Sequence, residues 1–127
     1  MASIQIKRAY DRPVPSDGKR ILIDRLWPRG LRKDAASLDL WNKEIAPRPS
    51  LRRWLDHRAD RFTEFKRCYR DELKSNHATA EILRQTSRGR TTLVYAARDR
   101  VVNHAVVLAE LLTKAQRRKT DGKEAQK

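Results

Sequence analysis

The chain has 127 residues, enough for one domain with a core of its own. Thirty lysines and arginines against sixteen acidic residues give a formal charge of +14, which favours an anionic partner such as nucleic acid or a phosphorylated small molecule. The apolar residues make up 39% of the chain and gather in short dense runs, which excludes an intrinsically disordered chain.

The single cysteine, Cys68, excludes an internal disulfide and a zinc site built from several cysteines. The first ten residues lack the apolar core of a signal peptide, and no apolar run approaches the roughly 18 residues that a membrane-spanning helix needs. We therefore expect a cytoplasmic protein that does not bind membranes.

The first elements expected are two strands. Residues 3–10 alternate apolar and polar side chains. A second strand is expected over residues 20–26, because the continuous apolar run at 21–23 is typical of a strand covered on both faces. The connection between them, residues 11–19, is short for a crossover of about a dozen residues. The first strand could therefore be parallel or antiparallel to the second.

The middle of the chain predicts a helical turn over 33–37, a weak third strand over 38–43 and a helix from Ser50, as its N-cap, to Asp56. A longer helix over 59–74 has one apolar face, formed by Phe62, Phe65, Tyr69 and Leu73.

The last third predicts a short helix around residues 78–83, a strand over 91–97 without a charge, and an apolar helix that Asn103 caps. Buried strands followed by irregular chain and helix predict a small α/β domain, with a mostly parallel sheet of three to four strands flanked by helices. We assign this domain to residues 1–113. Residues 114–127, with six basic and two acidic residues, predict a flexible basic tail.

Polar side chains follow two of the predicted strands, where ligands of open parallel sheets bind. If the two strands are neighbours, these residues share one cleft. The first group is Asp24, Arg25, Trp27, Arg29 and Gly30, and the second is Arg98, Asp99, Asn103 and His104. Tyr95, within the second of these strands, is a further candidate for ligand binding.

Arg25, Arg29 and Arg98 would supply planar cations suited to phosphate or carboxylate, and Gly30 would let the backbone approach the ligand. The alternative is structural: Arg25 pairs with an aspartate, and Trp27 covers the core.

Three residues are candidates for acid–base catalysis. His104, at a helix start, would be held neutral by the helix dipole, although a structural role is slightly favoured over a catalytic one. Asp24 or Asp99 could act as a general acid or base if burial raised its pKa, whereas neighbouring arginines would keep it ionised. The histidine and cysteine spacing matches no metal motif, and no cofactor is expected.

Nucleic acid is the alternative partner. Arginines crowd the middle helices, but the acidic residues interspersed there favour ordinary pairing on the helix surface. The basic tail is the stronger candidate for salt-sensitive contacts with phosphates.

Four fragments together resemble the short YeaO-like proteins, a group within the bacterial domain-of-unknown-function family 488. They are DGKRILIDRLWPRGL, LDLWNKEIAP, TTLVYAARD and NHAVVL. The resemblance spans about residues 4–112 and implies a Rossmann-like α/β fold in a bacterial protein, with no established activity to carry over. Longer relatives carry cysteines around the segment that matches residues 96–104, and this chain has none there.

These observations favour a protein that binds a nucleotide or another phosphorylated compound in an arginine-rich cleft. Such a protein could act on its ligand as a hydrolase or a transferase. The alternative is a nucleic-acid-associated accessory module that acts through surface charge and the basic tail. A third possibility is a regulatory protein whose cleft binds a protein partner. Whether the protein is an enzyme, and its oligomeric state, are left open.

Overall fold

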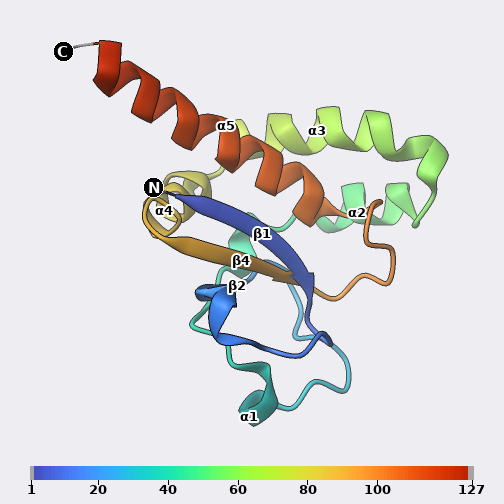
Figure 1. Cartoon of the computed structure of the whole chain (residues 1–127). Helices are drawn as coiled ribbons and strands as arrows, with labels where there is room; N and C mark the ends of the chain where they lie inside the picture. Colours follow the sequence, from blue (N-terminus) through green and yellow to red (C-terminus); the bar gives the residue numbers. More distant parts are fainter. Residues whose placement is uncertain (1, 126–127) are drawn as a thin grey trace.

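The computed structural model describes residues 2–125 of the chain, with side chains to residue 118. Its centre is a sheet of parallel strands in the order β1-β4-β2-β3 (Figure 1). The strands are β1 (Ser3–Arg8), β2 (Lys19–Leu22), β3 (Leu40–Trp41) and β4 (Arg90–Tyr95). The predicted α/β class, with a parallel Rossmann-like sheet and flanking helices, is confirmed.

The first strand, whose direction the sequence left open, is parallel to its neighbour β4. It does not pair with β2. β4 lies between them and pairs with both. Residues 9–18 therefore cross β4 and need no long helix to do so. Asp17, near the end of this connection, accepts hydrogen bonds from Gln5 and Lys7 of β1, and its carbonyl accepts one from Thr92 of β4.

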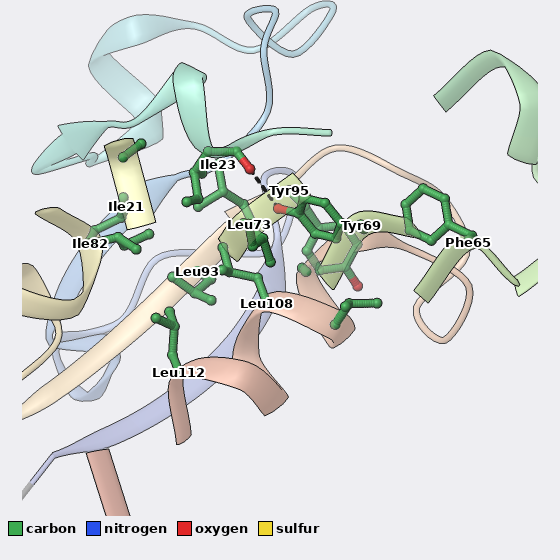
Figure 2. Packing of buried hydrophobic residues seen from close by; sticks show 14 of the residues in the cluster. Ile21, Ile23, Phe65, Tyr69, Leu73, Ile82, Leu93, Tyr95, Leu108 and Leu112 are labelled. Atoms are coloured by element: carbon green, nitrogen blue, oxygen red, sulfur yellow. Dashed lines mark hydrogen bonds between the residues drawn. The ribbon is translucent and has the colours of Figure 1, made fainter. Parts of the chain in front are cut away.

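The helices, apart from the one-turn helix α1 (Lys33–Ala36), gather on one side of the sheet (Figure 1). They pack on β2 and β4 through a single apolar cluster that includes Ile21, Leu93 and Leu108 (Figure 2). Besides α1, the helices are α2 (Pro49–Leu55), α3 (Phe62–Lys74), α4 (His77–Gln85) and α5 (His104–Ala125). The predicted inward face of α3 is confirmed, since Phe65, Tyr69 and Leu73 are buried.

The opposite face of the sheet is covered by irregular chain. Leu22 and Val94 point to this side, where Trp27, Leu31 and Leu38 pack on them in a second, smaller cluster. A buried polar network lies nearby, in which Arg20 donates to Asp17 over 2.7 Å.

Two local predictions are wrong in detail. The strand predicted over residues 20–26 ends at Leu22, because only the Ile23 N–H still bonds to Val94 before the chain leaves the sheet. Ser50 does not cap α2: Arg48 is the N-cap and Pro49 occupies the first turn, where its missing N–H costs nothing. Asn103 does cap α5, because its Oδ1 accepts from the Val106 N–H over 3.0 Å.

Helix α5 continues through the predicted tail to Ala125. The domain boundary at residue 113 and the flexibility of the tail stay predictions, and residues 126 and 127 lie outside the described part of the chain. Among the described helices, none combines the length and apolar character needed to cross a membrane.

Candidate functional site

A cavity of about 500 Å³ lies beyond the carboxyl ends of β2 and β4. Helix α2 and the first turn of α5 form its other walls. Its polar lining consists of Asp24, Arg25, Arg52, Arg53, Asp56, His57, Asn103 and His104. The remaining lining residues are Leu26, Ala46, Pro47, Pro49, Leu55, Ala97 and Val102, so the wall is largely apolar.

Asp24 joins the ends of the two central strands. It follows the last sheet hydrogen bond of β2, and its Oδ2 accepts from the Ala96 N–H just after β4 over 3.0 Å. Asp24 is only 7% exposed, and its other oxygen, Oδ1, is buried without a hydrogen-bond partner. This carboxylate therefore holds the floor of the cavity and is closed to solvent.

His104 lies against Asp24 at the start of α5. Its Nε2 is 3.0 Å from the Ile23 carbonyl oxygen and 3.3 Å from Asp24 Oδ1. A carbonyl can only accept, so Nε2 carries the proton in the neutral ring. Burial lowers the pKa of His104, and the Asp24 charge opposes this shift only in part. His104 is therefore neutral near pH 7, with burial as the main cause.

Three arginines reach the cavity from two segments. Arg25 donates from Nη2 to the Ala46 carbonyl over 3.2 Å, and its Nε is buried without a partner. Arg52 and Arg53 come from α2 and are exposed. Among the described residues, none of the three forms an ion pair, although the carboxylates of Asp24 and Asp56 also line the cavity.

The wall beside α2 contains an unusual backbone. Asp56 and His57 both have positive φ, 46° and 57°. Asp56 closes α2 by donating its N–H to the Arg52 carbonyl. The left-handed region is unfavourable for residues with a side chain, and such strain concentrates at functional sites.

No group of three or more His, Cys, Asp or Glu side chains within the described range is placed to hold a metal ion.

A family model described as "Inactive DUF488-N3 subclade" matches residues 3–127. The chain belongs to the DUF488 family. It is 42% identical to uncharacterized protein Rv3073c of Mycobacterium tuberculosis (strain ATCC 25618 / H37Rv), over 86% of this chain and 92% of the relative. It is 40% identical to uncharacterized protein YeaO of Escherichia coli (strain K12), over 87% of this chain and 96% of that protein. The resemblance to the YeaO-like proteins is thereby confirmed. No solved structure matches the chain.

Four of the site residues predicted for this DUF488 chain meet at the cavity: Asp24, Arg25, Asn103 and His104. The strands that precede them, β2 and β4, are neighbours as the shared cleft requires. The side chain of Asn103 is already occupied, because it caps α5 and donates from Nδ2 to the Asp99 carbonyl.

Three other predicted residues that follow β2, namely Trp27, Arg29 and Gly30, lie outside the cavity. Trp27 packs on the opposite face of the sheet, where its Nε1 donates to the Leu31 carbonyl and its ring meets Trp41 edge to face. This corresponds to the alternative in which Trp27 covers the core. Arg29 is exposed, and Gly30 has a φ of 77° in open space. Neither lines the cavity.

Three predicted residues around the end of β4 are also outside the cavity lining. Tyr95 is buried in the main core (Figure 2). Arg98 and Asp99 are exposed. Asp99 Oδ1 accepts from the N–H groups of Val101 and Val102, and these bonds lower the pKa of its carboxyl. Asp99 therefore shapes the loop that leads into α5.

Arg52 and Arg53 are the cavity residues that sequence reasoning missed, since it placed them among the paired surface charges. The sequence did contain an indication that these two arginines are unpaired. The seven residues of α2 include no carboxylate, whereas α3 carries several. His57, two residues beyond the end of the same helix, also lines the cavity.

Proposed function

We propose that this chain binds an anionic small molecule, a nucleotide or another phosphorylated compound, in the cavity beyond β2 and β4. One observation carries the proposal: Arg25, Arg52 and Arg53 converge on the cavity without an ion-pair partner among the described residues. Guanidinium groups bind phosphate through paired, charge-assisted hydrogen bonds. Three arginines against the two carboxylates of the lining, Asp24 and Asp56, leave net positive charge that a bound anion would neutralise.

The apolar part of the wall indicates what the rest of the ligand is like. Beside the arginines, the cavity is lined by Pro47, Pro49, Leu55 and Val102. Ligand sites commonly have volumes of about 300–1,000 Å³ and combine an apolar wall with a few polar groups. A molecule with one phosphate and an apolar or planar body fits this combination better than inorganic phosphate alone.

Binding without turnover is the favoured form of the proposal. The described cavity lining contains no Ser, Thr, Cys, Tyr or Lys that could act as a nucleophile. The Asp24 oxygen nearest His104 is closed to solvent and cannot contact a substrate without rearrangement. The matching family is also described as an inactive subclade. A hydrolase or transferase reaction would have to rely on His104, His57 or Asp56 to activate water or a second substrate.

Calorimetric titration with AMP tests the proposal on three proteins. Wild type is compared with the double variant Arg52→Gln/Arg53→Gln and with Arg98→Gln, whose exposed arginine lies outside the cavity lining. We expect the double variant to bind at least about tenfold more weakly, because two charge-assisted contacts are lost. Arg98→Gln should bind like wild type. Equal affinity of the double variant, or no binding by wild type, would overturn the proposal.

A second candidate function, association with nucleic acid, is favoured by the basic part of α5. Lys114, Arg117 and Arg118 are exposed and follow Leu112, which is buried. The end of α5 projects beyond the sheet (Figure 1). Exposed cations on a projecting helix can contact phosphates without sequence preference.

A further inference from the structure

One of the two ring nitrogens of His104, Nδ1, does not take part in the contact with Asp24. Nε2 of His104 points to the Ile23 carbonyl and to Asp24 Oδ1, 3.0 and 3.3 Å away. Nδ1 makes no hydrogen bond with the described residues, and the side chain lines the cavity at 14% exposure. In the neutral ring Nδ1 is an unprotonated nitrogen, so it can accept a proton.

The groups around His104 fit a ring that is neutral when the cavity is empty. Asp24 contributes one negative charge from the loop after β2, and Arg52 contributes a positive charge from α2. From α3, Tyr69 meets the imidazole edge to face, with ring centroids 6.1 Å apart. Burial raises the pKa of this phenol, whose hydroxyl donates to the Ile45 carbonyl, so it carries no charge.

We infer that His104 contacts the bound anion and takes up a proton at Nδ1 when the anion binds, and that Asp24 is the positioning residue that holds and balances the resulting imidazolium. This rests on the proposed function. The proton comes from solvent, and no other bond is made or broken. The imidazolium adds a fourth cation to Arg25, Arg52 and Arg53, so the site favours an oxyanion with two negative charges, such as a phosphate monoester, over a carboxylate.

The direction of the pH dependence follows from the charges. In the free protein burial keeps the ring unprotonated near neutral pH. A bound anion raises the pKa of His104, because it favours the charged form of the ring. Binding then takes up a proton, and affinity increases as pH falls. One coupled proton allows at most about a tenfold change in affinity per pH unit.

Sulfate is the suitable probe, because its charge does not change over the range of about pH 5.5 to 8.5 in which histidine titrates. Calorimetry across this range measures its affinity for wild type and for His104→Gln. The Gln amide can still donate to the Ile23 carbonyl, but it cannot be protonated. We expect wild type to bind sulfate several-fold more tightly for each unit of pH decrease. His104→Gln should show a nearly constant affinity.

Three controls separate His104 from other groups. His57→Gln removes the second histidine of the cavity, and His77→Gln removes an exposed histidine of α4. His77→Gln should keep the wild-type pH dependence, and in His57→Gln the pH dependence that His104 carries should remain. Asp24→Asn should move the pH profile to lower pH, because the imidazolium loses its counter-charge. The ring nitrogen NMR signals of His104 in wild type give a second readout, and they should change from neutral to imidazolium on addition of sulfate.

The outcomes distinguish this inference from the proposed function. If wild type binds sulfate with the same affinity at every pH, or if His57→Gln abolishes the pH dependence, proton uptake by His104 is wrong while anion binding stands. A neutral His104 ring in the sulfate complex would also contradict proton uptake by His104 and leave anion binding intact. If wild type does not bind sulfate at any pH, and does not bind AMP, both proposals fail together.

Discussion

Asp24 Oδ1 lies 3.3 Å from His104 Nε2, so the loop that ends β2 contacts the first residue of α5. The same carboxylate accepts the Ala96 N–H at the end of β4. One buried side chain thus connects three elements at the edge of the sheet where the cavity lies.

This position makes Asp24 important for stability as well as for binding. We expect Asp24→Ala to lower the free energy of unfolding by about 2–4 kcal/mol, because it leaves a partly buried N–H without its partner and removes the charge beside His104. Urea unfolding measures this. Asp34→Ala, at an exposed aspartate, is the control and should change stability by less than about 0.5 kcal/mol. Equal effects of the two substitutions would contradict this role for Asp24.

The contact between Asp11 and Arg100 predicts acid sensitivity. Two 2.8 Å hydrogen bonds from the Arg100 guanidinium lower the pKa of Asp11 from 3.8 to about 2. The stabilisation is therefore complete above the unfolded pKa near 4 and is lost as pH falls toward 2. Because Arg100 is largely exposed, its size should not exceed about 1 kcal/mol.

Comparison of wild type with Asp11→Asn tests this by urea unfolding at several pH values. The difference in unfolding free energy between the two proteins should be largest above about pH 4 and should shrink toward pH 2. A difference that stays constant, or that grows in acid, would show that the ion pair does not stabilise the fold.

The left-handed backbone at Asp56 predicts a substitution that increases stability. Glycine adopts a φ of 46° without steric cost, so Asp56→Gly should raise the free energy of unfolding by about 0.5–1 kcal/mol. It also removes a carboxylate from the cavity wall and should strengthen anion binding. Asp71→Gly, within helix α3, should instead destabilise by about 1 kcal/mol. Thermal unfolding of both variants decides whether the backbone at Asp56 is strained.

The alternative role in nucleic-acid association has its own test. Substitution of both Arg117 and Arg118 by Gln should weaken binding to duplex DNA and reduce the slope of log affinity against log salt by about two. Arg52→Gln/Arg53→Gln should leave that slope unchanged. Fluorescence anisotropy at several salt concentrations measures both. Identical slopes for wild type and the Arg117/Arg118 variant would exclude α5 as a contact surface for nucleic acid.

Sequence reasoning predicted the part of the site that lies nearest to the strand ends. Asp24 and Arg25 immediately follow the apolar run at residues 21–23, and His104 follows the residue that caps α5. Short distances along the chain from regular elements leave little freedom, so their positions follow from the parallel pairing of β2 and β4.

The rest of the site depends on loop geometry, which local patterns do not determine. Gly30, with its positive φ, lies in a turn closed by a hydrogen bond from the Leu31 N–H to the Pro28 carbonyl, and Arg29 is exposed. The turn that Asp99 forms leaves Arg98 in solvent. The arginines of α2 reach the cavity only because that helix packs beside α3, a tertiary contact that its own sequence does not reveal.

The most direct test of the central claim is an NMR titration of the isotope-labelled protein with AMP, followed through its backbone amide signals. Ligand binding in the cavity predicts that the largest shifts occur at Arg52, His57 and Val102, with little change at Arg98 or in the exposed turns of α3. Shifts confined to Lys114, Arg117 and Arg118 of α5, or no shifts at millimolar AMP, would contradict the assignment of this cavity as an anion-binding site.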